Sequence, residues 1–260
     1  MRVALFVTCL VDQFRPTTAE ASVRILEDSD CIVDYDSDQT CCGQPAFNPG
    51  IHDQALPVCR RTIHRLADQL DEGCEAIVAP SGSCVAMFRH AVELLHKEGS
   101  EEDAEAAARV AGASMELASF LVRRLGREDL GATWFGKVAW HDACHGLREL
   151  GIHDEPRRLL SAVRGLELIE SATCDRCCGF GGTFSVDLPG ISTGMADDKI
   201  DELESLGIDA VVSGDTSCLM QLEGRLEARG SRIRGVHIAE ILASREMIPT
   251  SEQRAPGMTS

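Results

Sequence analysis

The chain contains the same blocks twice, in the same order. A Cys-Cys-Gly triplet occurs at residues 41–43 and again at residues 177–179. A lone Cys precedes each triplet and another follows it: Cys9 and Cys84 in the first half, Cys144 and Cys218 in the second. Cys9 lies 32 positions before its pair, and Cys144 lies 33 positions before its own. This order and spacing indicate an internal duplication, so we expect two similar halves.

Short apolar segments alternate with segments of helical periodicity. Strands are expected at residues 3–7, 32–35, 76–79, 138–140, 166–170, 210–212 and 236–238. Helices are expected at residues 17–28, 51–72, 84–97, 155–163, 191–206, 217–228 and 239–245. The Ala- and Glu-rich residues 100–130 contain no Pro and predict one or two helices, with a break near Gly112. Alternating strands and helices predict parallel βαβ units, and therefore an α/β fold with two pseudo-symmetric halves.

The duplication also suggests how the chain divides. We expect a first repeat over residues 1–99, a helical connector over residues 100–134 and a second repeat over residues 135–248. The last stretch, residues 249–260, combines Ser, Gln, Arg and Pro, and we expect it to be a disordered tail.

Charge and hydropathy exclude several classes of function. The formal net charge of -17 argues against binding to nucleic acid, which needs a basic surface. Apolar runs are too short to span a membrane, and the run at residues 3–7 is too short for a signal peptide. We therefore expect a cytoplasmic protein. In a reducing compartment, 12 Cys are more typical of metal ligands or redox centres than of disulfides.

The repeated Cys should converge in space. In parallel sheets, binding sites form beyond the carboxyl ends of the strands. Each lone Cys directly follows the carboxyl end of a predicted strand. The Cys pairs lie in loops that can fold back to the same edge. The expected ligands form a first tetrad, Cys9, Cys41, Cys42 and Cys84, and a second tetrad, Cys144, Cys177, Cys178 and Cys218.

Four thiolates can hold zinc or an iron–sulfur cluster, and reactive thiols are a third interpretation. Structural zinc sites usually draw on two close-set Cys knuckles, whereas these Cys are widely spaced and two are adjacent. We therefore favour a cluster. Gly43 and Gly179 relax the backbone after each pair, and Gly181 and Gly182 could bring N–H groups close to sulfide.

Other polar residues near the tetrads are candidates for supporting roles. His141, His145 and Arg148 surround Cys144, where they could hydrogen-bond to the cluster loop, transfer protons or bind a carboxylate. Cys174 is an additional candidate ligand. Asp215 could supply an oxygen ligand or cap a helix, and we favour the cap. Three Cys have no counterpart in the other half and are expected to be buried apolar residues: Cys31, Cys59 and Cys74.

Several of these segments together resemble the CCG (cysteine-rich) domain family. They are residues 6–12, 40–45, 80–84, 141–148 and 177–184. The resemblance extends over about residues 1–245. It implies one or two clusters of the [4Fe–4S] type in a cytoplasmic electron-transfer subunit. The implied partners are two further subunits of a complex that oxidises L-lactate to pyruvate, at least one with ferredoxin-type clusters.

One departure from the family pattern limits this implication. The family's fullest pattern has a fifth Cys for a noncubane cluster, but Ser81 and Asp215 occupy that position here. This disfavours the rival hypothesis of a heterodisulfide-reductase-type subunit that reduces a disulfide or quinone directly at its cluster. The favoured hypothesis is an accessory electron carrier, since the chain has no flavin or nicotinamide fingerprint. A zinc-stabilised scaffold is the non-redox alternative.

Overall fold

The chain forms two parallel sheets with the same strand order. The structure is a computed structural model that describes residues 1–245, so the tail expected at residues 249–260 lies outside the described residues. The first sheet has the order β2-β1-β3-β4, with strands Arg2–Leu5 (β1), Ile32–Asp34 (β2), Ala76–Ala79 (β3) and Ser114–Glu116 (β4). The second has the order β6-β5-β7-β8, with strands Thr133–Trp140 (β5), Arg164–Ile169 (β6), Ala210–Ser213 (β7) and Arg234–His237 (β8). Every strand pair is parallel, which confirms the predicted α/β fold and its pseudo-symmetry.

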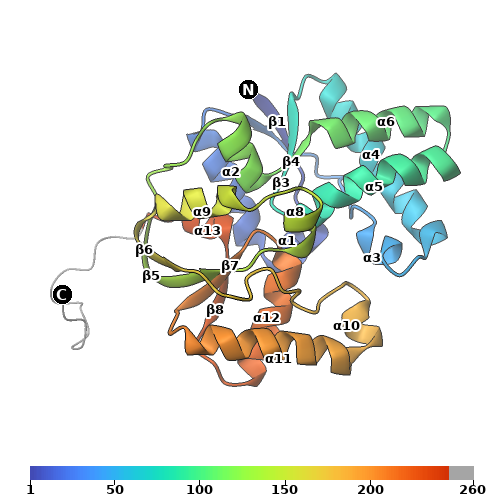
Figure 1. Cartoon of the computed structure of the whole chain (residues 1–260). Coiled ribbons are helices and arrows are strands. Elements are labelled where there is room, and N and C mark those ends of the chain that lie inside the picture. The colour runs from blue at the N-terminus through green and yellow to red at the C-terminus, as the bar shows by residue number, and fades with distance from the viewer. Residues whose placement is uncertain (246–260) are drawn as a thin grey trace.

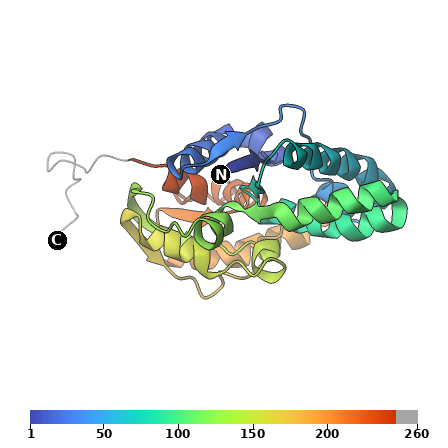
Figure 2. The same ribbon diagram turned by 90° about the horizontal axis from the view of Figure 1, so that it is seen from above.

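Except for the helix Glu101–Ala113, the helices also follow a common order in the described parts of the two halves. Those of the first half are Cys9–Phe14 (α1), Pro16–Asp28 (α2), Gln44–Phe47 (α3), His52–Asp71 (α4), Gly82–Glu98 (α5), Glu101–Ala113 (α6) and Leu117–Ser119 (α7), followed by a π-helical turn at Phe120–Arg124 (η1). Those of the second half are Cys144–Arg148 (α8), Asp154–Ser161 (α9), Phe184–Asp187 (α10), Pro189–Ser205 (α11), Thr216–Ala228 (α12) and Ile238–Leu242 (α13). In Figure 1 the first half lies above helices α11 and α12 of the second, and in Figure 2 α5 and α6 extend side by side from the body.

One or two helices were expected through residues 100–130, and the break expected near Gly112 is confirmed, but a strand follows it. Helix α6 begins at a capping box formed by Ser100 and Asp103, and it ends at Ala113. The next three residues form β4, which pairs with β3 in the register Ile77↔Ser114. So short a strand has no periodicity of its own, and pairing with its neighbour determines its conformation. The first sheet thus gains the strand that matches β8 in the second.

Both halves contribute to one central core. Val3, Leu5 and Ile25 of the first half belong to the same buried cluster as Trp140 and Ile238 of the second. Helix α2 packs against α13. At the edge of this contact, Arg15 forms ion pairs with Glu223 and Glu240. The two sheets are therefore held in one body, with the carboxyl ends of their central strands close together.

Candidate metal centre

The first tetrad assembles at the carboxyl edge of the first sheet. Cys9 is the first residue of α1, and Cys84 lies in the first turn of α5, just after β3. The pair Cys41 and Cys42 comes from the loop before α3. The Sγ atoms of Cys9 and Cys41 are 3.4 Å apart, as are those of Cys42 and Cys84. Two sulfurs bound to one metal at about 2.3 Å would be about 3.8 Å apart, so the thiols are close enough to share a centre.

The second tetrad repeats this arrangement. Cys144 begins α8, Cys218 lies in the first turn of α12, and the pair precedes α10. In both tetrads the lone Cys before the pair and the first Cys of the pair are half-buried, while the other two Cys are buried. The structure thus brings together the eight Cys named as expected ligands, although their binding of metal stays a prediction.

Close thiols change each other's acidity. Hydrogen bonds from Cys42 and Cys9 lower the pKa of the Cys41 thiol to about 3, and the N–H of Gly43 acts in the same direction. Hydrogen bonds from Cys144 and Cys178 likewise lower the pKa of Cys177 to about 2. Each tetrad therefore favours the thiolate form of one Cys, and thiolate is the form that binds soft metals.

The glycine after each pair shapes the loop around this thiolate. Gly43 has a φ of +94° and Gly179 a φ of +87°, a region that favours glycine. The N–H of Gly43 lies 3.5 Å from Cys41 Sγ, and that of Gly179 lies 3.4 Å from Cys177 Sγ. Gly181 and Gly182 also line the space in front of the Cys pairs. Their positions suit the expected N–H contacts to sulfur.

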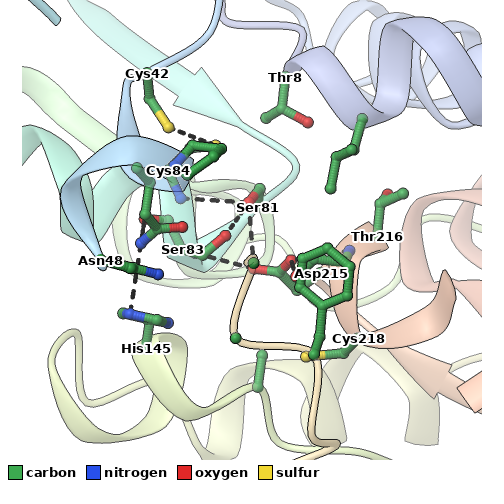
Figure 3. Close-up of a pocket in the computed structure, with 18 of the residues that line it drawn as sticks. Thr8, Cys42, Asn48, Ser81, Ser83, Cys84, His145, Asp215, Thr216 and Cys218 are labelled. Atoms are coloured by element: carbon green, nitrogen blue, oxygen red, sulfur yellow. Dashed lines mark hydrogen bonds between the residues drawn. The ribbon is translucent and has the colours of Figure 1, made fainter. Parts of the chain in front are cut away.

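The two tetrads line a single cavity of about 380 Å³. All eight Cys contribute to its wall, together with apolar side chains that include Leu10, Phe180 and Val186. Figure 3 shows Cys42 and Cys84 on one side of this space and Cys218 on another. A single metal ion held by four thiolates needs no such space, whereas a cluster of several metal and sulfide atoms does.

The halves meet in the wall of this cavity through equivalent residues. Ser81 and Asp215 form an isolated antiparallel bridge. The Asp215 carboxylate accepts hydrogen bonds from the Ser81 hydroxyl (3.2 Å) and the Ser83 N–H (3.0 Å), as Figure 3 shows. Its other oxygen accepts from the N–H of Ser217 and makes Asp215 the N-cap of α12. The predicted capping role of Asp215 is confirmed, and the residue also links the two halves.

The other candidate residues differ in their relation to the cavity. His145 lines it, with Nδ1 3.5 Å from Cys144 Sγ and Nε2 3.4 Å from the Gln44 amide nitrogen. Arg148 points elsewhere, donating to the Asp175 carbonyl, and is not among the described residues that line the cavity. Cys174 is also outside the lining, and its thiol pairs with Asp142. A carboxylate-binding role for Arg148 inside the cavity therefore has no support from its position.

His141 lies beneath the second tetrad rather than in the cavity wall. It is 1% exposed, and neither ring nitrogen has a hydrogen-bond partner among the described residues. One of its nitrogens lies within 4.8 Å of the sulfurs of Cys178 and Cys218. Burial lowers the pKa of His141 to about 3, so the ring is neutral and has one donor and one acceptor nitrogen. Unpaired buried polar atoms of this kind fit a site that binds a metal group.

Three Cys belong to the core, as expected. Cys31, Cys59 and Cys74 are at most 6% exposed, and Cys59 lies on the buried face of α4. Burial raises the pKa of the Cys59 thiol to about 12, so it is protonated and a poor ligand.

Sequence reasoning missed a buried lysine behind the second tetrad. Lys199 is 1% exposed, and its ammonium donates to the carbonyls of Thr173, Cys174 and Arg176. The available signal was its position on the apolar face of α11, in line with Ala196 and Ile200. A lysine at such a position is rarely buried without a partner.

Comparison with known proteins identifies relatives over nearly the whole chain. The family described as cysteine-rich domain (CCG) matches residues 3–89 and again residues 138–223. A protein named "Lactate utilization protein A" from Bacillus subtilis (strain 168) is 42% identical over 245 residues, which are 94% of this chain and 100% of that protein. A protein of the same name from Geobacillus kaustophilus (strain HTA426) is also 42% identical, with the same coverage.

A solved structure shares the fold. The crystal structure of a hypothetical protein from Helicobacter pylori superposes with a TM-score of 0.63 at 12% identity, covering 95% of this chain. This chain spans about half of that one, 49% of its length. Within residues 1–245, we find no helix whose length and apolar character would allow it to cross a membrane.

Proposed function

Because this chain belongs to the cysteine-rich CCG domain family, we propose that it is an iron–sulfur electron-transfer subunit of a system that oxidises L-lactate to pyruvate. The observation that carries the proposal is the pair of Cys tetrads facing one cavity. The name shared by relatives that match over their full length supports the link to lactate. We propose a cytoplasmic location and two partner subunits, at least one with ferredoxin-type clusters.

The arrangement of thiols favours a cluster over zinc. Each tetrad combines two adjacent Cys with two that are remote in sequence, and both tetrads open onto a space of about 380 Å³. A bound [4Fe–4S]-type cluster would supply reversible one-electron chemistry. Each tetrad would hold its own cluster, anchored by the buried thiols of Cys42 and Cys84 in the first and of Cys178 and Cys218 in the second. The N–H groups of the loop glycines would donate to its sulfur atoms.

The role we propose is relay, with the hydride chemistry in a partner. A one-electron centre cannot accept a hydride in one step, and the sequence has no fingerprint for a cofactor that can. The isolated chain should therefore not oxidise lactate, and turnover should appear when its partners are added. Robust lactate-dependent dye reduction by the chain alone would contradict this.

The first experiment is metal analysis of anaerobically purified protein. We expect iron and acid-labile sulfide, with EPR signals after reduction. Cys178→Ser should lower the iron content because a hydroxyl is a poor substitute for thiolate. Cys59→Ser is the matched control, since this Cys is equally buried but lies in the core, and it should keep its iron. Stoichiometric zinc without sulfide, or iron loss only in Cys59→Ser, would reject the proposal.

The cavity also favours a second candidate function. Its volume of about 380 Å³ and partly apolar wall could admit a disulfide or quinone that would then be reduced directly at the tetrads. The absence of a fifth Cys, replaced by Ser81 and Asp215, counts against it. Reduction of a disulfide or quinone by the isolated, dithionite-reduced chain would favour this alternative, and inertness towards both would favour the relay.

A further inference from the structure

Each loop that carries a Cys pair accepts hydrogen bonds from a helix side chain at an equivalent position, but the donor group differs between the halves. In the first half, the Thr62 hydroxyl of α4 donates to the Cys41 carbonyl at 2.8 Å. In the second half, Lys199 of α11 takes this place and donates to three carbonyls of the loop before Cys177. The equivalence follows from the neighbouring core positions, which are Ile63 and Leu66 in α4, and Ile200 and Leu203 in α11. A neutral hydroxyl in one half thus corresponds to a buried ammonium group in the other.

A second difference lies just beyond the central strand of each sheet. Phe6 follows β1, is fully buried, and packs edge-on against Phe88 with ring centroids 5.1 Å apart. His141 follows β5 at the equivalent position, with a nitrogen within 4.8 Å of two thiols of the second tetrad. The first tetrad is therefore backed by an apolar ring, and the second by a polar one whose nitrogens have no other described partner.

Lys199 lies close to the second tetrad, because its ammonium donates to the carbonyl of Arg176, the residue directly before Cys177. Burial lowers the pKa of its ammonium, and negative charge on Cys174, Cys178 and Cys218 acts in the opposite direction. The negative charge of Glu202, whose carboxylate accepts hydrogen bonds from Ser171 and the Thr173 N–H, also acts on Lys199 and offsets part of its charge. The carbonyl oxygens around Nζ satisfy its donors without cancelling its charge. The positive charge thus remains available to the thiolates.

Such a charge must affect reduction. Adding an electron to a thiolate-bound centre makes it more negative, and a buried cation or a donor N–H nearby stabilises the reduced state. The N–H groups of Gly43 and Gly179 are matched between the halves, so they do not distinguish the tetrads. Lys199 and His141 do distinguish them, and both stabilise the reduced second centre, whereas the negative charge of Asp215, whose counterpart is Ser81, acts on Cys144 in the opposite direction.

We propose that the two centres are inequivalent, and that Lys199 and His141 give the centre at the second tetrad the higher reduction potential. This inference rests on the proposed function, in which each tetrad holds an iron–sulfur centre. One electron would leave the reduced first centre and reduce the second, so that electrons supplied by a partner collect at the second tetrad. Lys199 and His141 would act on this centre through its thiolates and would not exchange electrons themselves.

The test is an EPR-monitored redox titration of the anaerobic protein. Wild-type protein should show two potentials. Lys199→Met should lower only the higher one, and a tenfold change in the reduction equilibrium corresponds to 59 mV for one electron. His141→Phe, which introduces the side chain found in the first half, should shift the same potential in the same direction. In Cys42→Ser, which should lack the first centre, the remaining signal should titrate at the higher potential.

Control variants distinguish a failure of this inference from a failure of the proposed function. Lys137→Met removes a lysine of the same half that is half-exposed and paired with Glu167, and both potentials should stay unchanged. If Lys199→Met fails to fold, His141→Phe still tests the assignment. Two equal potentials, or a shift of the lower one in these variants, would overturn the inference alone. Wild-type protein without iron and sulfide would overturn the proposed function itself.

Discussion

Replacing Glu116 by Gln should make folding stability less dependent on pH. Glu116 ends β4 and caps α7, where its carboxylate accepts a hydrogen bond from the Ser119 N–H at 3.0 Å. The residue is 4% exposed. Burial raises the pKa of this carboxyl from 4.5 to about 7, and the negative charges of Glu155 and Asp215 contribute to the same shift.

The raised pKa determines the sign and size of the contribution of Glu116 to the free energy of unfolding. Because the folded state binds the proton more tightly than the unfolded state, the protonated carboxyl favours folding at low pH. This contribution declines as the pH rises from about 4.5 to about 7, and it is absent above that range. At 1.36 kcal/mol per pKa unit, the difference corresponds to about 3 kcal/mol of unfolding free energy. Gln has no proton to lose, and its amide oxygen can still accept from Ser119.

Urea denaturation at several pH values between 5 and 8 measures the effect. Glu116→Gln should gain stability relative to wild type as the pH rises, by up to about 3 kcal/mol at pH 8. Glu93→Gln is the matched control, because this carboxylate is exposed and its pairing with Lys97 lowers its pKa. That variant should show no such gain. If the free energies of unfolding of Glu116→Gln and wild type differ by the same amount from pH 5 to pH 8, the reasoning is refuted.

Two further substitutions test the loop and the contact between the halves. Gly179→Ala should cost at least about 1–3 kcal/mol in thermal unfolding, because φ is +87° and the added Cβ would lie 2.5 Å from the Ser192 carbonyl oxygen. Gly190→Ala, with no neighbour within 4 Å, should be tolerated, and equal costs would contradict the proposed strain. Asp215→Ala should cost about 2–4 kcal/mol in denaturant unfolding because several buried donors lose their acceptor. The control is Asp129→Ala, because Asp129 is exposed, lies outside helices and strands, and accepts only from Gly131 among the hydrogen bonds described. A similar loss of stability in this variant would show that the contact between the halves contributes little.

The sequence predicted what depends on local pattern. Repeated apolar segments and helical periodicity led to parallel sheets, and strand polarity led to the convergence of Cys9 and Cys84 at one edge. Strand β4 was missed because three residues carry no periodicity, and pairing with β3 determines their conformation. The role of Lys199 was missed because a lysine in a helical segment normally indicates an exposed face.

The relation between the halves was beyond sequence reasoning for a different reason. Each tetrad follows from the strands of its own sheet, but a shared cavity depends on how the two sheets are oriented. That orientation results from packing between α2 and α13 and from the bridge between Ser81 and Asp215. None of these contacts leaves a periodic signal, because each joins segments that are far apart in the chain.

The common core has a consequence for synthesis on the ribosome. Ile25 and Leu26 of α2 are buried in the same cluster as Ile238 and Ile241 of α13, near the end of the described chain. Translation proceeds at about 5–20 residues per second, so the N-terminal half emerges many seconds before the helix that covers it. During that interval its apolar face is open to water and to other nascent chains. We expect chaperone binding to this intermediate, and an early stop codon before α13 should yield an aggregating product rather than a stable half.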